Sequence, residues 1–214
     1  MYIWSRGRSS LNAHHWMARW VKRAGAIAPL SACCKLTTVC AQFVVKVGEY
    51  AHVTTVSLWG IHLIIYARCE VANEITHLQT STVATGLANV MGNKGGAAAS
   101  FVYRDATSFA FVGCHLAARA SRLRERGEDY MNICKGLHLG SKGLQFLHQF
   151  HHVFWMGDLN YRINNGDETP EEFARVIQCI ESRQLWRLRQ QDQLANEMRT
   201  KPIFAGFKVR VVLL

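Results

Sequence analysis

The sequence lacks the features that mark several specialised classes of protein. Its seven cysteines include no C-x-x-C pair and are odd in number, which argues against a disulfide framework and against a structural zinc site. The most apolar early stretch, residues 24–47, is interrupted by Pro29, Lys35 and Gln42, so it is a poor membrane span. No internal repeat or low-complexity tract stands out. These absences fit an ordinary globular domain in a reducing compartment.

Acidic residues are absent from residues 1–48, and most of the excess positive charge lies in this segment. Its basic residues are Arg6, Arg8, Arg19, Lys22, Arg23, Lys35 and Lys46. The formal net charge of +10 predicts an anionic partner: phosphate groups on a small molecule, a lipid headgroup or nucleic acid. A basic, acid-free start also occurs in organelle transit peptides, but Trp4, Trp16 and Trp20 and the absence of a clear amphipathic stripe argue against that interpretation.

The remainder of the chain alternates strand and helix patterns, which predicts an α/β protein. Alternating apolar residues and short apolar runs predict strands, and amphipathic runs predict helices. The helix that begins at Pro170 has Thr169 as a plausible cap. The expected strands lie within residues 50–68, joined around Trp59 and Gly60, and at residues 97–103, 108–114 and 153–156. The expected helices lie within residues 118–137, 170–181 and 185–198.

The first segment with chemical content is the glycine-rich stretch at residues 85–96. Glycines let the backbone approach a phosphate closely, Asn93 tolerates a left-handed turn while donating hydrogen bonds, and Lys94 supplies a point charge. The same residues also make a good hairpin turn with a solvated lysine, so this loop alone does not decide between the two.

The second segment is an apolar strand, residues 111–116, that finishes in His115. An imidazole at a strand end could hold or protonate a phosphoryl oxygen, although a single histidine there is more often a structural residue.

The third segment, residues 155–162, places Asp158, Asn160 and Arg162 directly after a buried strand. Asp158 could orient and deprotonate water, Asn160 could donate to phosphoryl oxygens, and Arg162 could bind phosphate or fix the aspartate. The alternative is a turn aspartate followed by a solvated arginine.

Together and in this order, the three segments resemble the inositol-polyphosphate 5-phosphatase family. Its members carry a T-G-x-x-x-x-x-G-N-K-G loop, a C-H-L strand end and a G-D-L-N-Y-R motif, and all three are matched here. Further family-like pieces lie at residues 57–61, 126–130, 192–194 and 204–207. The resemblance predicts a partial catalytic domain at 49–207, a basic segment of no assigned fold at 1–48 and a tail outside the family at 208–214.

The resemblance implies a partial four-layer α/β sandwich of the DNase I-like type, and a phosphoric monoester hydrolase that removes the 5-phosphate of inositol phosphates or phosphoinositides with Mg²⁺. On this analogy the catalytic positions are His115, Asp158 and Asn160, and the positions that line or support the phosphate site are Asn93, Lys94 and Arg162. Metal and hydrogen-bond donors would stabilise the phosphoryl charge while an oriented water attacks in line.

The sequence departs from the family pattern at both ends. Family members have a Gln-Glu pair upstream whose Glu binds magnesium, and residues 1–50 contain none, so no metal ligand is assigned. Downstream, the P-T-Y-K, W-C-D-R-I and S-D-H segments of the family are replaced by residues 208–214. Our hypothesis is an incomplete or mis-spliced gene model, and we expect little or no turnover from the sequence as it stands.

Two alternatives come from other classes of protein. One is a non-catalytic phosphoinositide-binding pseudoenzyme that uses Lys94, Arg162 and the basic opening segment. The other is a nuclease relative on the same fold, which the basic pI favours, but no basic stretch interleaved with stacking aromatics is present and we expect no nucleic acid partner. We expect a cytoplasmic protein, and we leave open a peripheral contact with membranes.

Overall fold

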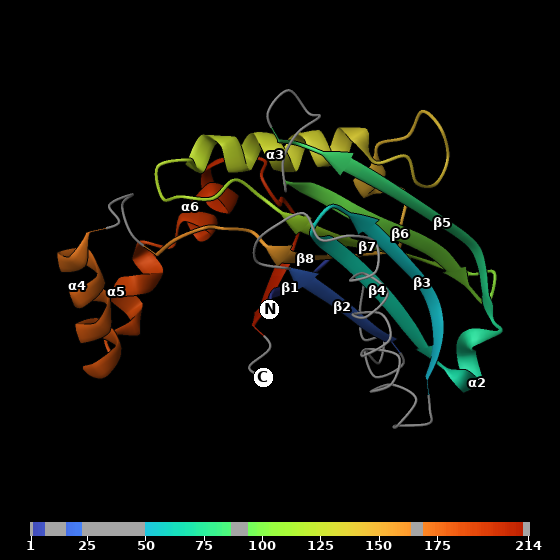
Figure 1. The fold of residues 1–214 in the computed structure, drawn as a ribbon, viewed down its shortest axis with the longest axis horizontal. Coiled ribbons are helices and arrows are strands. Elements are labelled where there is room, and N and C mark those ends of the chain that lie inside the picture. Colours follow the sequence, from blue (N-terminus) through green and yellow to red (C-terminus); the bar gives the residue numbers. More distant parts are fainter. Residues whose placement is uncertain (1, 7–15, 23–49, 87–93, 164–168, 212–214) are drawn as a thin grey trace.

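The computed structural model describes residues 2–6, 16–22, 50–86, 94–163 and 169–211 (Figure 1). These residues form two β-sheets that pack face to face, a helix that covers the outer face of the larger sheet, and a helical pair that projects to one side. The elements in chain order are β1 (Tyr2–Arg6), β2 (Trp16–Lys22), β3 (Tyr50–Leu58), β4 (Ile61–Arg68), α2 (Cys69–Ala72), β5 (Ile75–Ala84), β6 (Gly95–Tyr103), β7 (Thr107–His115), α3 (Leu123–Gly136), the 3₁₀ turn η2 (Phe146–His148), β8 (His152–Asp158), α4 (Pro170–Glu181), α5 (Leu185–Gln190), α6 (Gln193–Thr200) and β9 (Lys208–Val211).

The larger sheet has the strand order β5-β6-β7-β8-β1-β9, and the smaller sheet has the order β2-β4-β3. The pair β7–β8 is parallel, and every other neighbouring pair is antiparallel. Thus β1 and β2, from the opening basic segment, each enter a different sheet, and β9 closes the larger sheet beside β1.

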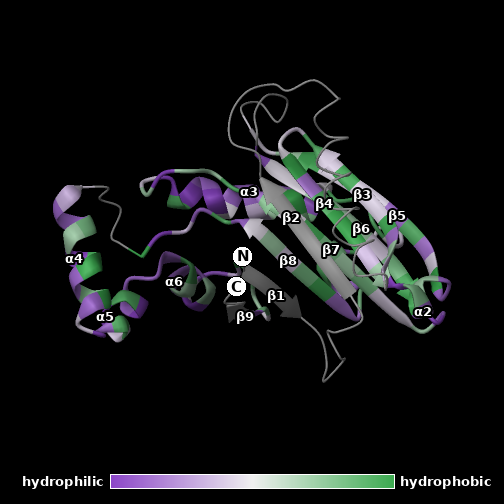
Figure 2. Ribbon diagram, turned by 60° about the horizontal axis from the view of Figure 1, so that its bottom comes forward, coloured by the Kyte–Doolittle hydropathy of each residue, from purple (hydrophilic) through white to green (hydrophobic). Residues whose placement is uncertain are grey.

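The main apolar core lies between the two sheets. Ile61, Leu63 and Ile65 from β4 face small and aromatic side chains of the larger sheet, where the rings of Phe111 and Phe154 stack at 5.0 Å. Figure 2 shows apolar residues concentrated along the strands that make this core. Burying each such large side chain contributes roughly 1.5–3 kcal/mol, so the sandwich forms a rigid base for the loops at its ends.

The outer face of the larger sheet carries a second core. Tyr130 and Ile133 of α3 pack on this face together with Trp155 of β8 and Phe204. Tyr130 lies 4.2 Å from Phe204 between ring centroids, and Trp155 meets the same ring edge-on at 5.4 Å. This packing fixes α3 across the sheet near the carboxyl ends of β7 and β8.

The structure confirms the expected α/β class. The predicted strand pair around Trp59 and the pair joined by residues 104–106 are present as β3–β4 and β6–β7. Arg104 and Asp105 both have positive φ angles, +53° and +50°, as the tight hairpin requires. Thr169 caps α4 by accepting the N–H of Glu172 at 3.2 Å.

One expectation about helices was wrong. The single helix expected at 185–198 is two helices, because Asp192 accepts the N–H groups of Leu194 and Ala195 and so starts α6 anew. The helix expected within residues 118–137 is present as α3, which begins at Leu123 after the loop that follows β7.

Four strands were not predicted: β1, β2, β5 and β9. β5 is a ten-residue edge strand whose central residues are exposed and, apart from Leu78, polar, so it lacks the apolar alternation that reveals a half-buried strand. Among the described helices, none is long and apolar enough to cross a membrane.

Candidate active site

The predicted site residues meet at one edge of the larger sheet because of strand direction. β7 and β8 are parallel and in register, with His115 opposite Asp158 as each strand ends. β6 runs the other way and begins opposite the same point, where Gly95 pairs with His115. Lys94, which immediately precedes β6, is therefore brought next to two strand ends that are distant in sequence.

The three side chains form a compact cluster. Lys94 Nζ donates to His115 Nε2 at 2.6 Å, which requires that this ring nitrogen carries no proton. The nearer Asp158 carboxylate oxygen, Oδ2, lies 3.8 Å from the same nitrogen. The His115 side chain is 4% exposed and that of Asp158 is 30% exposed, so the carboxylate faces solvent while the imidazole forms the buried side of the cluster.

Two glycines allow this close approach. Gly157 has a φ of +130°, and a Cβ built there would lie 2.0 Å from the carbonyl oxygen of Cys114. Gly95 has a φ of +144°, and a Cβ there would lie 2.1 Å from the carbonyl oxygen of Val83. Any side chain at either position would push the strands apart where the site residues converge.

The turn after β8 is tied to the end of β7. Asn160 has a φ of +56°, a left-handed conformation that asparagine tolerates. Its side-chain amide donates to the carbonyl oxygen of Leu116 at 2.9 Å, and its backbone N–H donates to Asp158 Oδ1 at 3.2 Å. Arg162 Nη2 lies 3.5 Å from Asn160 Oδ1, so the guanidinium sits on the same side of the turn.

A buried arginine connects the two loops that carry the site. Arg126 of α3 is fully buried and donates to the carbonyl oxygens of Ala117, Arg119 and Ala120 at 3.3, 2.5 and 3.1 Å. It also donates to Gln193 Oε1 at 2.7 Å.

Gln193 completes the connection, because the same Oε1 accepts the backbone N–H of Arg162 at 3.1 Å. The loop after His115 and the loop after Asp158 therefore share one hydrogen-bond network through α3 and α6.

Asp129 supports the first of these loops from one turn further along α3. It is buried and accepts the N–H of Ala117 at 2.8 Å. Burial raises the pKa of this carboxyl above its usual value, although its hydrogen bonds and the charge of Lys94 oppose the shift.

Arg126, Asp129 and Gln193 were not among the predicted site residues. Their segments are family-like, but charged and polar side chains on a helix are usually solvated, so the burial of these three residues cannot be predicted from the sequence. Of the predicted residues, Lys94, His115, Asp158, Asn160 and Arg162 lie together, and Asn93 lies outside the described residues.

Within the part of the chain that the structure describes, no three His, Cys, Asp or Glu side chains come together as a metal site. At the cluster itself, Lys94 and His115, a cation and a buried imidazole, accompany Asp158. The described residues alone therefore do not fit a complete site for a hard divalent cation.

A two-sheet α/β sandwich with His, Asp and Asn at adjacent strand ends places the protein in the class of DNase I-like α/β sandwiches. Residues 28–211 match Endonuclease/Exonuclease/phosphatase family 2, and the chain belongs to this family.

Similar proteins include phosphoinositide 5-phosphatases, as the motifs predicted. The chain is 41% identical over 162 residues to phosphatidylinositol 3,4,5-trisphosphate 5-phosphatase 1 of Xenopus laevis and 39% identical over 155 residues to that of Homo sapiens. These alignments cover 74% and 71% of the chain but 16% and 13% of the relatives.

Among solved structures, the inositol polyphosphate 5-phosphatase domain of spsynaptojanin, in complex with inositol (1,4)-bisphosphate and calcium ion, superposes with a TM-score of 0.72. Its sequence is 29% identical, and the match covers 87% of this chain and 53% of that domain.

Proposed function

We propose that the cluster of Lys94, His115, Asp158, Asn160 and Arg162 binds and hydrolyses the 5-phosphate of inositol polyphosphates or phosphoinositides. The observation that carries the proposal is the convergence of these side chains from three strand ends onto one partly open edge of the sheet. Similarity to relatives named 5-phosphatases, and to a domain solved with inositol (1,4)-bisphosphate, supports the choice of substrate class.

Positive charge at the site suits a phosphate group. Lys94 provides a point charge, and Arg162 provides a planar fork of donors that can bind two phosphoryl oxygens at once. The Asn160 amide already donates to Leu116 with one hydrogen, which leaves its second hydrogen for an oxygen of the substrate.

The reaction follows from these positions. Asp158, the partly exposed carboxylate, orients a water molecule and accepts its proton as the water oxygen forms a bond to phosphorus. The bond from phosphorus to the inositol oxygen breaks, that oxygen takes up a proton, and the products are inorganic phosphate and an inositol hydroxyl. Lys94, Arg162 and Asn160 stabilise the charge that develops on the phosphoryl oxygens, and His115 holds Lys94 in place through its short hydrogen bond.

The proposal also names Mg²⁺ as the metal ion that assists the reaction. Mg²⁺ in phosphoryl-transfer sites is commonly held by one or two carboxylates together with substrate phosphates. Asp158 would supply one such carboxylate, and the ion would neutralise phosphate charge. A calcium ion accompanies the inositol phosphate in the related synaptojanin domain, which supports a divalent cation in this class of site.

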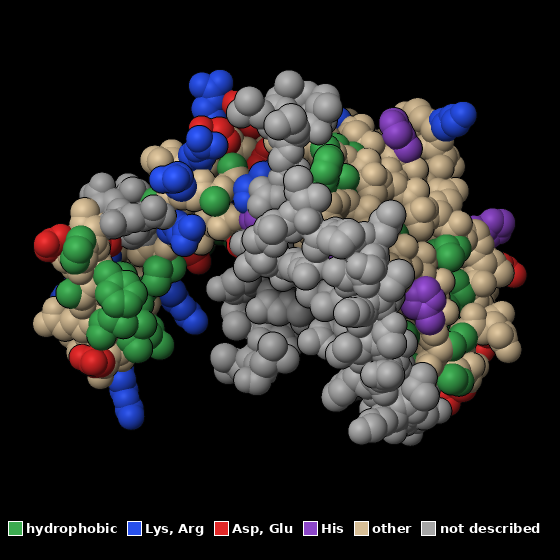
Figure 3. All heavy atoms as spheres, viewed as in Figure 1, with side chains coloured by type: hydrophobic (Ala, Val, Ile, Leu, Met, Phe, Trp, Pro, Cys, Tyr) green, Lys and Arg blue, Asp and Glu red, His purple; other side chains and the backbone are tan. Residues whose placement is uncertain are grey.

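A peripheral contact with membranes also belongs to the proposal. The α4–α5 pair exposes Phe173, Ile180, Leu185 and Trp186 by 49–68%, and Figure 3 shows these apolar side chains gathered on one face of the pair. Tryptophan and large aliphatic side chains beside arginines favour the interface of an anionic membrane. We propose that the protein is cytoplasmic and that this face holds it against a phosphoinositide-containing surface.

The test separates binding from hydrolysis. Binding of a soluble phosphatidylinositol 4,5-bisphosphate analogue is measured by calorimetry, and phosphate release is measured with and without Mg²⁺. We expect the unmodified chain to bind the analogue. In Asp158→Asn, the rate of any phosphate release should fall by about two orders of magnitude or more, while binding of the analogue is largely kept.

Each other outcome has a defined meaning. Binding with slow release that depends on Asp158 supports a phosphatase with the low turnover expected from the sequence, and binding with no release at all favours the pseudoenzyme alternative. An absence of binding contradicts the proposal, and release that is equal in Asp158→Asn contradicts the role of this carboxylate.

A further inference from the structure

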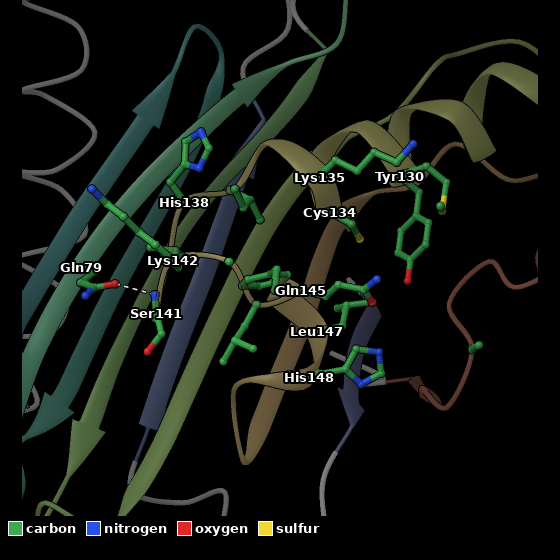
Figure 4. A pocket seen from close by; sticks show the side chains of 18 of the residues that line it. Gln79, Tyr130, Cys134, Lys135, His138, Ser141, Lys142, Gln145, Leu147 and His148 are labelled. Atoms are coloured by element: carbon green, nitrogen blue, oxygen red, sulfur yellow. Dashed lines mark hydrogen bonds between the residues drawn. The ribbon is translucent and has the colours of Figure 1, made fainter.

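A pocket of about 1350 Å³ lies on the helix-covered face of the larger sheet (Figure 4). It is bounded by the second half of α3, by the loop that follows this helix and by residues 202, 205 and 206. None of the five clustered site residues lines it. The pocket is therefore a concave surface separate from the candidate active site.

The loop that forms one wall is held in a defined shape. Gln149 accepts the N–H of Ser141 at 2.6 Å and donates to the carbonyl oxygen of Leu144 at 3.0 Å. From the other side, Gln79 of β5 accepts the N–H of Gly140 at 2.6 Å. These side chains replace regular secondary structure as partners for the loop backbone, so the wall is a built part of the fold.

The floor of the pocket is apolar. Tyr130, Leu137, Leu139 and Phe146 line it, and each is at most 5% exposed because it also packs in the core of this face. Leu144 stands at the mouth and is 64% exposed. Such a surface gains free energy by covering an alkyl chain, at roughly 0.8 kcal/mol for each buried CH₂ group.

The polar part of the lining has one sign of charge. Lys135 and Lys142 line the pocket together with His138 and His148, and none of the described lining residues is acidic. Cys134, also in the lining, does not alter this balance, because burial raises the pKa of its thiol to about 12 and the group stays neutral. An anionic group is favoured here and a cationic one is disfavoured.

We propose that this pocket binds a single-chain amphiphile with an anionic head group, such as a fatty acid. The alkyl chain lies on the apolar floor, and the head group lies at the rim of the pocket, where Lys135 and Lys142 supply positive charge. The volume exceeds the roughly 300–1,000 Å³ usual for small-molecule sites, which leaves room for both parts. This activity is independent of the proposed phosphatase function and uses none of its residues.

The test uses decanoate, decanol and acetate as probes of the whole chain by isothermal titration calorimetry. Decanol has the tail without the charge, and acetate has the charge without the tail. We expect saturable 1:1 binding of decanoate and no measurable binding of acetate. Decanol should bind at least about fivefold more weakly than decanoate. Lys94→Ala should bind decanoate as the unmodified chain does, which separates this pocket from the active site.

Variants locate the site. Lys135→Glu combined with Lys142→Glu should weaken decanoate binding about tenfold, and Leu144→Asp should weaken decanoate and decanol alike. Arg187→Glu on α5 is the matched control and should change nothing. Equal affinity for decanoate and decanol, indifference to the lysine reversal, or binding only to decanoate-containing vesicles and not to the monomer would each overturn the proposal.

Discussion

At the scale of single residues, the site depends on backbone positions that accept only certain side chains. Gly157 lets β8 end against Cys114, and Asn160 then turns the chain in the left-handed region so that its amide reaches Leu116. Asp158 lies between these two residues, so its direction is set by the backbone on both sides and not by its own contacts alone.

Gly157→Ala should be among the most destabilising small substitutions in the chain. Its Cβ would lie 2.0 Å from a carbonyl oxygen, so the paired ends of β7 and β8 would have to separate. We expect a loss of more than about 3 kcal/mol in the free energy of unfolding, measured by urea denaturation. Gly143→Ala is the control, since Gly143 has a φ of +86° but open space around it, and its cost should be about 1 kcal/mol.

Asp129 should give stability a specific pH dependence. Because burial raises its folded-state pKa above 3.8, the folded chain binds more protons at this group than the unfolded chain does. The stability it contributes is full below the unfolded pKa and is lost as the pH rises through the folded pKa. We therefore expect the free energy of unfolding, relative to Asp129→Asn, to fall as the pH rises above about 4. Denaturation curves that keep a constant difference over this range would contradict the assignment.

At the scale of elements, α3 does more than cover the sheet. Its buried Arg126 holds the loop after β7 and reaches α6 through Gln193, which in turn holds the backbone of Arg162. The helix therefore sets the distance between the two loops that carry the candidate catalytic residues.

Arg126→Met should keep much of the side-chain volume and remove this network. Several carbonyl oxygens and Gln193 Oε1 would lose a charged donor inside the protein, with an expected loss of about 3 kcal/mol in the free energy of unfolding. Arg124→Met is the matched control on the same helix, because the Arg124 side chain is 88% exposed and its ion pair with Glu128 lies at the surface. This substitution should cost less than about 0.5 kcal/mol. Similar losses for the two variants would show that the network carries no stability.

Strand prediction from the sequence succeeded where burial leaves a pattern. β4, β6 and β7 are apolar and bounded by turns, and they were expected close to their observed positions. β5 was missed because the exposed residues at its centre are mostly polar, and the break before α6 was missed because Asp192 resembles an ordinary polar residue inside a helical pattern. The motif residues were expected to act together, but the sequence could not show that Lys94 touches His115, because that contact comes from sheet register.

At the scale of the whole molecule, the α4–α5 pair and the active-site edge follow one another in the chain but differ in character. The pair makes few core contacts, and Cys179 and Leu188 are its only buried residues among those described in residues 169–190. Its apolar face is exposed, whereas the site edge is polar and partly closed.

If this face contacts membranes, substitutions on it should weaken binding to vesicles and leave binding of a soluble substrate unchanged. Trp186→Ser combined with Ile180→Asp should weaken binding to vesicles containing phosphatidylinositol 4,5-bisphosphate by about tenfold or more, measured by co-sedimentation. Binding of a soluble inositol phosphate should not change, since neither residue belongs to the site. Exposed Leu78 on β5 offers a control, and Leu78→Asp should leave vesicle binding unaltered.

The most direct test of the central claim compares inositol 1,4,5-trisphosphate with inositol 1,4-bisphosphate, which lacks only the 5-phosphate, by titration calorimetry with Mg²⁺. The claim that Lys94 and its neighbours hold the 5-phosphate predicts that the trisphosphate binds about tenfold more tightly or better, and that Lys94→Ala removes most of this difference. Equal affinity for the two ligands, or a preference that survives Lys94→Ala unchanged, would contradict it.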